Sequence, residues 1–240
     1  MDKVKKNDFV EIEFTGYANN KIFDTTNPKE AAKITNNQNL KDIKPVVVSV
    51  GNGMLLKGFD ESLDEKEIEK EYEITLTPEK AFGKRYSDLI KTVPIKIFRE
   101  KNTMPYPGMT IQLDNSIAKV LSVSGGRVIV DFNNPLAGKE IKYKFKIIKK
   151  IENDEERINA MQDFFFRQRF KFKIEEKKVI FEDKKIKYIV DLFNEKLKTI
   201  SGFDFVVEEK EDKEEKNKSK EAKKEKDVKS EEIKKENKEQ

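Results

Sequence analysis

The sequence feature that most constrains the fold is a strand pattern that recurs far along the chain. Between Asp8 and Phe14 apolar and charged residues alternate, with Val10, Ile12 and Phe14 on one face. Residues 143–147 show the same alternation, with lysines between the apolar positions. Such alternation is typical of a strand with one buried face. Because the texture of the chain changes between the two strands, we expect one domain built from segments on both sides of an insert.

Three further segments belong to the expected first domain. Residues 45–50 form a continuous β-branched run, which is typical of a strand buried on both faces. Residues 72–76 alternate again. Between these strands, Gly51 and Gly53 precede the apolar residues of 55–59, a pattern that indicates a turn entering a short helix. Several antiparallel strands around one short helix predict an α+β domain.

Prolines and glycines become frequent in the segment that interrupts this domain. Residues 120–130 predict a hairpin that turns at Gly125-Gly126. The alternative is a long ordinary loop, but structureless loops of this length are uncommon inside compact domains. We therefore expect a small β-rich inserted domain. The expected boundaries are 1–85 and 134–151 for the two parts of the first domain and 86–133 for the insert.

A third unit is predicted at residues 152–207. Residues 153–156 supply a helix cap and an acidic first turn, and an aromatic-rich helix follows. Two strands are expected around 170–181, then a helix whose apolar stripe runs from 186 to 197, then a last strand. This C-terminal α+β domain is small for its own core and rich in apolar residues. We therefore expect a homodimer through it, in preference to docking on the first domain.

Residues 208–240 contain almost nothing but Lys, Glu, Asp, Asn and Ser. Such a segment has too little apolar surface to order itself, so we expect a charged, disordered tail. The mixed signs of its charges favour a solvated segment over a nucleic-acid-binding one.

The absence of two residue types excludes several chemistries. The 240 residues contain no cysteine and no histidine, so thiol chemistry and the histidine-dependent catalytic sets are impossible. The acids are scattered, so we expect no metal and no cofactor. With 50 basic and 46 acidic residues the net charge is +4, and we expect no nucleic-acid partner. The charged start and the lack of a long apolar run predict a cytoplasmic protein with no membrane partner.

Four segments occur in an order that is specific to one family. They are Val10–Tyr17 with Lys21–Thr26, Val50–Asp60, Leu76–Gly83 and Asp131–Gly138. Together they resemble the FKBP-type peptidyl-prolyl cis/trans isomerases. The interruption between Gly83 and Leu136 resembles the insert-in-flap domain of the long, SlyD-like members. The third unit and the tail lie outside this resemblance.

The resemblance implies an antiparallel half-barrel wrapped on the short helix, with an apolar pocket between them. The implied catalytic residues are Asp24, Phe23, Leu56, Phe59, Phe82 and Tyr143, and Phe14 and Leu55 are implied to bind substrate. Phe59 would form the floor beneath the proline ring, the Leu56 N–H would hold a substrate carbonyl, and Asp24 would orient the site or act electrostatically. Rotation about a prolyl bond needs no nucleophile, only surroundings that favour a twisted amide. The alternative is that Phe14, Phe23, Leu55 and Phe59 belong only to the core, above all Phe14 and Leu55. For Asp24, the alternative is that its carboxylate stabilises the following turn.

Four positions depart from the family pattern. Phe82 stands where many members have a tyrosine, and Asn134 stands where long members usually have histidine. Glu65 and Glu69 replace glycines that are common in the turn after the short helix, so we expect that turn to be rebuilt.

The resemblance also implies that the insert binds extended, unfolded chains. Apolar residues of the insert are the candidates for this surface, and methionine suits varied partners. The candidate residues are Ile97, Phe98, Met104, Tyr106 and Met109, followed by Ile111 and Leu113. The alternative is that about half of these side chains form the insert's own core, which we favour for Ile111 and Leu113.

Three functions compete at this point. The first is a prolyl isomerase and folding chaperone that acts on unfolded or proline-containing polypeptides, with the insert raising the local substrate concentration. The second is a holdase chaperone with little or no isomerase activity. The third, an adaptor that binds nucleic acid or ribosomes through lysine-rich faces, has the weakest support.

Overall fold

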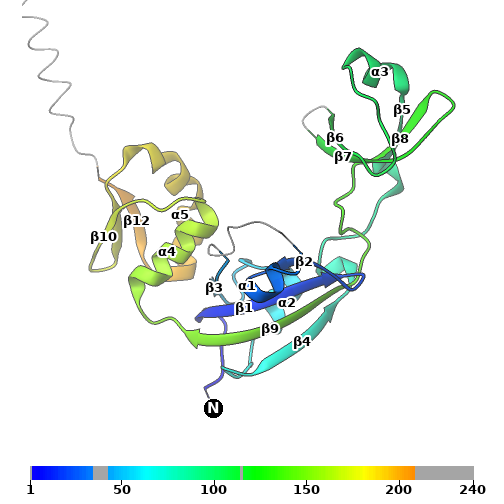
Figure 1. Cartoon of the computed structure of the whole chain (residues 1–240). Helices are drawn as coiled ribbons and strands as arrows, with labels where there is room; N and C mark the ends of the chain where they lie inside the picture. The colour runs from blue at the N-terminus through cyan, green and yellow to red at the C-terminus, as the bar shows by residue number, and fades with distance from the viewer. Residues whose placement is uncertain (1, 35–42, 114–115, 209–240) are drawn as a thin grey trace, which may run out of the picture. The chain divides into compact units, whose positions relative to one another are not determined.

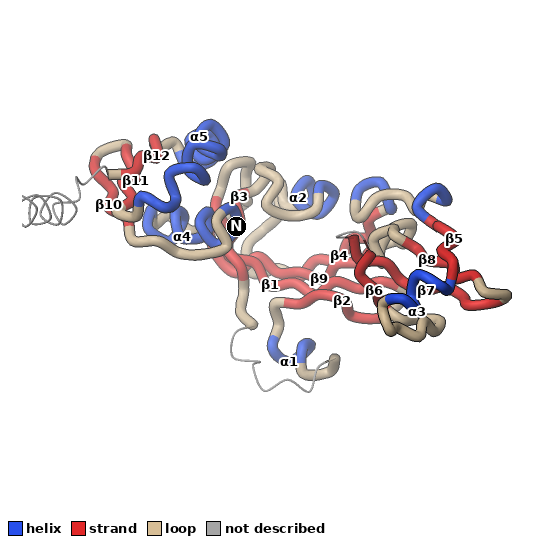
Figure 2. Tube along the Cα trace, turned by 90° about the horizontal axis from the view of Figure 1, so that it is seen from above, coloured by secondary structure: helices blue, strands red, loops and turns tan. Residues whose placement is uncertain are grey.

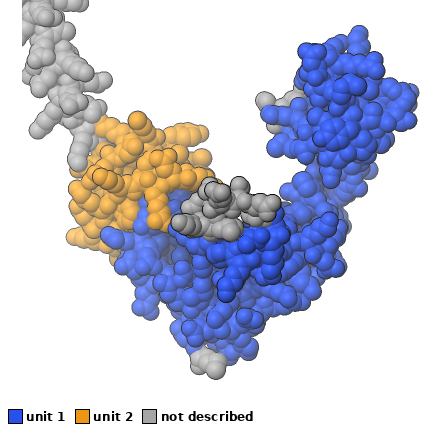
Figure 3. Space-filling view, in the orientation of Figure 1, with its two compact units in different colours: residues 1–164 blue, residues 165–240 orange. Residues whose placement is uncertain are grey.

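The computed structural model describes residues 2–34, 43–113 and 116–208 of the 240-residue chain. The chain divides into two compact units, residues 1–164 and 165–240 (Figure 3). The predicted tail, apart from Glu208, lies outside the described residues. Among the helices of the described part, none is long and apolar enough to cross a membrane.

The first unit is built on an antiparallel sheet that gathers strands from both ends of its sequence (Figure 1). Its strands are β1 (Phe9–Ala18), β2 (Lys21–Thr25), β3 (Val46–Ser49), β4 (Glu71–Leu76) and β9 (Ile141–Lys150). The order is β2-β1-β9-β4, and β3 pairs with β1. Phe14 of β1 lies opposite Phe145 of β9, so the two alternating segments of the sequence form neighbouring strands. The chain between the two strands therefore leaves the sheet and returns to it.

The short helix α2 (Lys57–Ser62) lies on the apolar face of this sheet and carries Phe59 into the core. The turn before it needs Gly51 and Gly53, whose φ angles are +76° and +72°. The buried carboxylate of Asp60 accepts a 2.8 Å hydrogen bond from the backbone N–H of each of these glycines. The helix is thereby tied to the turn that precedes it, which fixes the positions of the apolar residues between them. One further short helix, α1 (Pro28–Ala31), follows β2, and the 3-10 turn η2 (Pro78–Lys80) follows β4.

The insert has its own sheet and core. The sheet has the order β5-β8-β7-β6 and is preceded by the 3-10 turn η3 (Ser87–Leu89). Its elements are β5 (Ile90–Pro94), α3 (Ile95–Glu100), β6 (Thr110–Leu113), β7 (Ser116–Ser124) and β8 (Arg127–Asp131). The predicted hairpin is confirmed: β7 and β8 are joined at Gly125-Gly126, and both glycines have positive φ. A hairpin turn with two such residues matches the twist of the strands it joins.

Helix α4 (Asp154–Phe165) begins in the first unit and ends where the second unit begins. The guanidinium of Arg157 lies 4.7 Å from the centre of the Phe9 ring of β1. This contact places the start of the helix with the first domain. The expected boundary at residue 152 therefore differs from the division between the compact units, which falls after Phe164.

The second unit is a small α+β fold, as its apolar pattern predicts (Figure 2). It contains β10 (Phe172–Glu175), β11 (Lys178–Phe181), the 3-10 turn η4 (Lys184–Ile186), α5 (Lys187–Ser201) and β12 (Asp204–Val207). Strand β11 lies between β10 and β12, antiparallel to the first and parallel to the second. Helix α5 ends at Gly202, whose φ of +79° permits the left-handed cap.

The turn after α2 keeps the backbone that glycine would favour, although glutamates occupy it. Glu65 and Glu69 have φ angles of +60° and +63°. Their N–H groups donate to the carbonyl oxygens of Val4 and Ile147, at 2.9 and 2.7 Å. The prediction that this turn is rebuilt is therefore wrong. The surrounding hydrogen bonds hold the left-handed conformation against the cost that a Cβ imposes there.

Replacing Glu69 by glycine should stabilise the first unit. The left-handed conformation costs a non-glycine residue about 1–2 kcal/mol, and the extra freedom of glycine in the unfolded chain offsets about half of this gain. We expect the free energy of unfolding to rise by about 0.5–1 kcal/mol, measured by chemical denaturation. Glu71→Gly, in β4, is the control and should destabilise the protein. Equal destabilisation by both variants would contradict the expectation.

Candidate active site

The centre of the first unit is a cluster of aromatic rings between α2 and the sheet. Phe59 stacks on Tyr143 with ring centres 4.4 Å apart, and both rings are almost fully buried. Phe14 meets each of them edge-on, at 5.6 and 5.7 Å. Edge-to-face and stacked pairs of this kind add stability beyond the burial of their area. Two strands, β1 and β9, and the helix α2 thus form a rigid apolar floor.

Two further rings extend the cluster toward solvent. Phe23 of β2 meets Tyr143 edge-on at 6.0 Å and Phe82 at 5.7 Å. Phe23 and Phe82 are half-buried, and so are Leu55 and Leu56 at the entrance to α2. The buried rings therefore have a rim of partly exposed apolar side chains around them. Of the eight pocket residues implied by the resemblance, Phe14, Phe23, Asp24 and Tyr143 lie on strands and Phe59 lies on α2. Leu55 and Leu56 lie directly before α2, and Phe82 lies in the loop after η2.

Gly16 makes the close packing of these rings possible. It lies in β1 directly between Asp24 of β2 and Tyr143 of β9. A Cβ at position 16 would approach ring carbons of Phe23 and Tyr143 to 2.8 Å, closer than real contacts allow. The two rings consequently converge over a position that only glycine leaves open. Gly16 lies within a segment quoted for the family resemblance, but the pocket residues predicted from the sequence did not include it.

The ionisable groups of the pocket are Asp24 and Tyr143. Burial raises the pKa of Asp24, and a hydrogen bond with the Thr25 backbone partly opposes this rise. Burial also raises the pKa of Tyr143, and the negative charge of Asp24 raises it further. The phenol therefore keeps its proton at neutral pH. The pocket presents one carboxylate beside one neutral hydroxyl in apolar surroundings.

Leu56 occupies the N-cap position of α2. Its carbonyl oxygen accepts from the N–H groups of Phe59 and Asp60. The N–H groups at the start of a helix have no partner within the helix and are available to other acceptors. This position suits a backbone donor at the edge of an apolar pocket.

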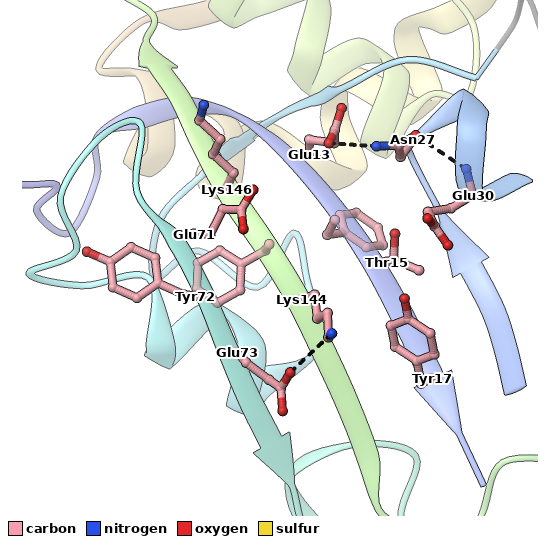
Figure 4. Close-up of a pocket in the computed structure, with 12 residues that line it drawn as sticks. Glu13, Thr15, Tyr17, Asn27, Glu30, Glu71, Tyr72, Glu73, Lys144 and Lys146 are labelled. Atoms are coloured by element: carbon pink, nitrogen blue, oxygen red, sulfur yellow. Dashed lines mark hydrogen bonds and ion pairs between the residues drawn. The ribbon is translucent and has the colours of Figure 1, made fainter. Parts of the chain in front are cut away.

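The opposite face of the same sheet carries a second, polar hollow of about 430 Å³ (Figure 4). Charged residues that point away from the aromatic floor line it, and they pair across the strands. Glu73 lies 3.5 Å from the Lys144 ammonium, and Glu13 accepts from the Asn27 amide at 2.9 Å. This hollow was not predicted from the sequence, although the alternation of β1, β4 and β9 places these charges on one face.

The insert candidates separate into exposed and buried side chains. Met104 and Tyr106 are well exposed, Ile97 is partly exposed, and Met109 packs partly buried on the insert's core. Phe98 is 3% exposed and lies within that core. It was predicted to belong to the polypeptide-binding surface, and its burial shows that this prediction is wrong. Ile111 and Leu113 also belong to this core, as favoured. Three further apolar residues, Ile117, Leu121 and Ile129, are exposed on β7 and β8 and were not among the predicted candidates.

Asn134, which stands where long members usually have histidine, stabilises a local turn. Its side-chain oxygen accepts a 2.8 Å hydrogen bond from the backbone N–H of Leu136. The neighbouring Asn133 is buried and makes more extensive contacts.

Among the described residues, no group of three or more acidic side chains is arranged to hold a metal ion.

Comparison with known proteins identifies the fold and the insert. The FKBP-type peptidyl-prolyl cis-trans isomerase family matches residues 1–98, and the IF domain of FKBP26 matches residues 91–136. The short-type peptidyl-prolyl cis-trans isomerase of Methanocaldococcus jannaschii is 33% identical over 147 residues, which are 61% of this chain and 94% of that protein. SlyD of Helicobacter pylori is 26% identical over 164 residues, 67% of this chain and 80% of that protein. SlyD of Treponema pallidum is 32% identical over 101 residues, 40% of this chain and 57% of that protein.

The chain therefore belongs to the FKBP-type peptidyl-prolyl cis-trans isomerases. Within this family it is a SlyD-like enzyme with an insert-in-flap domain, which confirms the predicted fold class and activity. Neither family match extends beyond residue 136.

Substituting Gly16 by alanine should damage the pocket while leaving the sheet intact. The new methyl group would force the Phe23 and Tyr143 rings apart, because both lie within 3 Å of its position. We expect kcat/KM on an Xaa-Pro tetrapeptide to fall at least tenfold, with a far-UV circular dichroism spectrum close to that of the native protein. Tyr17→Ala, on the opposite face of the same strand, is the control and should keep its activity. Full activity of Gly16→Ala would contradict this account of the pocket.

Proposed function

We propose that this protein is a folding enzyme that rotates Xaa-Pro bonds in the aromatic pocket while its insert holds unfolded polypeptide. The observation that supports this most directly is the convergence of Phe59, Tyr143 and Phe14 into a floor with a partly exposed apolar rim. Such a surface fits a proline ring and excludes water. Prolyl rotation breaks no covalent bond, so the pocket needs no nucleophile.

The chemistry follows from the origin of the barrier. Amide resonance makes rotation about the prolyl bond cost about 20 kcal/mol. Water stabilises the planar amide by hydrogen-bonding its polar carbonyl, whereas the twisted amide is less delocalised. An apolar pocket therefore favours the twisted state relative to water.

Each pocket residue has a proposed role in that process. Phe59 supports the proline ring, and Phe23, Phe82, Leu55 and Phe14 enclose it. The Leu56 N–H holds a carbonyl of the substrate, which fixes the chain on one side of the rotating bond. Asp24 supplies the polar edge of the pocket, and Tyr143 contributes its ring and its neutral hydroxyl to the floor. Partial burial raises the pKa of Asp24, and a partly desolvated carboxylate interacts more strongly with a substrate dipole than a fully hydrated one.

Removing the pocket's carboxylate should slow catalysis without unfolding the protein. Asp24 lies on the edge strand β2 and is not part of the buried core, so Asp24→Leu should leave the core packing unchanged. We expect at least a tenfold loss in the exchange rate of a short Xaa-Pro peptide, followed by NMR with the full-length protein. Phe59→Leu, which keeps the core filled but alters the floor, should show a similar loss. If both variants retain native rates, the aromatic pocket is not the isomerase site.

The insert is proposed to bind unfolded chains through side chains outside its core. Met104 and Tyr106 are well exposed, and both lie in the connection between α3 and β6. An irregular segment with a flexible thioether and a rigid aromatic ring can adapt to many partners. These residues are separate from the insert's core, so their substitution leaves that core unchanged.

The double variant Met104→Ser/Tyr106→Ser should lose chaperone activity and keep isomerase activity. We expect its suppression of aggregation of a chemically unfolded protein, measured by light scattering, to weaken at least threefold. Its rate on a tetrapeptide should equal that of the native protein, because a tetrapeptide fills only the pocket. Undiminished suppression by the double variant would exclude this surface.

The second unit is proposed to join two copies of the chain. Tyr188 is 76% exposed and Leu192 is 62% exposed, and the two residues lie one turn apart on α5. Two large apolar side chains that share one helix face favour self-association over solvent exposure. Val206, on strand β12, is exposed as well.

Charges on this helix face should separate the proposed dimer. We expect Tyr188→Glu/Leu192→Glu to halve the mass measured by light scattering after size-exclusion chromatography. The exposed Tyr106→Glu variant is the control and should keep the native mass. A native protein that is already monomeric would exclude the dimer.

A further inference from the structure

Two chain segments connect the insert to the first domain, and hydrogen bonds join them. The first runs from Gly83 to Leu89 and the second from Asp131 to Gly138. The N–H of Gly138 donates to the Gly83 carbonyl at 2.8 Å, and the N–H of Phe132 donates to the Leu89 carbonyl at 2.9 Å. These segments, which we call the neck, are therefore paired along their length.

A buried asparagine fixes the middle of the neck. The Asn133 side chain accepts from the Tyr86 N–H at 2.8 Å and donates to the Tyr86 carbonyl at 2.9 Å. It also donates to Asp131 at 2.7 Å, while the Asn133 backbone N–H donates to the same carboxylate oxygen at 2.9 Å. Both backbone groups of Tyr86 are thus held by one side chain on the other segment.

An ion pair reinforces this arrangement. The Arg85 guanidinium donates to Asp131 through two nitrogens, at 2.6 and 3.0 Å. Burial acts to raise the pKa of Asp131, but the hydrogen bonds from Asn133 and Arg85 prevail and lower it. Asp131 therefore stays ionised and holds Arg85 and Asn133 in place.

The neck presents two large apolar side chains to solvent while fixing their backbone. Tyr86 is 60% exposed and Leu89 is 41% exposed. Single exposed apolar side chains are common and need no function. Here, however, the backbone at Tyr86 is held by a buried polar group, so little conformational freedom remains to be lost when a ligand binds.

Chain connectivity limits how far this pair lies from the pocket. Phe82, on the pocket rim, precedes Tyr86 by four residues, so their Cα atoms are at most about 14 Å apart. A peptide whose proline occupies the pocket can therefore reach Tyr86 with about four or five extended residues. This limit holds for any orientation of the insert.

We propose that Tyr86 and Leu89 form an additional substrate subsite, which binds an apolar residue of the client polypeptide about four to six positions from the proline. Asn133, Asp131 and Arg85 act as positioning residues for this subsite. The subsite rests on the proposed function of the pocket, since the pocket fixes the position of the proline. The subsite lets the enzyme select prolines that have apolar residues near them in the sequence. Such apolar residues are typical of segments that become buried on folding.

Peptides of different length provide the test. One is an Xaa-Pro tetrapeptide; the others are twelve-residue peptides with leucine or serine five positions before or after the proline. We expect the native enzyme to show a KM at least threefold lower for one of the leucine peptides than for its serine counterpart, at similar kcat. Tyr86→Ser/Leu89→Ser should abolish this difference and leave the tetrapeptide rate unchanged. Ile34→Ser, at an exposed apolar residue of the first unit, is the control and should retain the difference.

The positioning role has its own readout. Asn133→Ala should raise the KM for the leucine peptide toward that of the double variant, without changing kcat on the tetrapeptide. A difference of less than twofold between leucine and serine peptides in the native enzyme would overturn the subsite. Persistence of the difference in the double variant would overturn it as well.

If the tetrapeptide itself is not isomerised, the proposed pocket fails. Anisotropy of the labelled leucine peptide then tests the subsite separately, and unchanged affinity in the double variant would overturn it.

Discussion

The pairing of β1 with β9 is the interaction on which the rest of the structure depends. It joins residues 9–18 to residues 141–150 through a long antiparallel ladder. Closing so long an intervening segment costs entropy, although this cost grows only slowly with length. The hydrogen bonds of the ladder and the apolar face that it buries offset this loss of entropy. The insert can then fold on its own core. The aromatic floor depends on the same pairing, because Phe14 and Tyr143 come from the two partner strands.

Two residues that line no part of the pocket determine how its apolar side chains are arranged. Gly16 lets rings from two neighbouring strands converge, and the Asp60 carboxylate holds the turn that leads into α2. Neither residue contributes an apolar surface of its own. Their effect is to place partly exposed apolar side chains around a buried floor that includes Tyr143, with Asp24 beside it on the edge strand β2. An environment of this kind acts on the substrate through solvation and shape alone.

Much of this fold follows from the sequence because its strands alternate cleanly and its turns carry glycines. The strands of the first domain, the hairpin at Gly125-Gly126 and the helix ended by Gly202 all have local signals. The left-handed backbone at Glu65 and Glu69 has no such signal, because long-range hydrogen bonds maintain it against local preference. The burial of Phe98 could not be predicted from the sequence either, because one aromatic residue in a short helix is equally compatible with a core and with a binding surface. The role of Gly16 required the positions of rings on two other strands.

The hairpin turn of the insert has a consequence for how the polypeptide tolerates being severed. A cut between Gly125 and Gly126 divides the chain so that one fragment carries β1 and the other carries β9. The ladder between these strands, and those of β9 with β4 and β7 with β8, would hold the fragments together. The nicked molecule would therefore behave as a complementing pair of halves. The same site would accept new chain ends, and a circularly permuted protein that starts at Gly126 would preserve every strand described here.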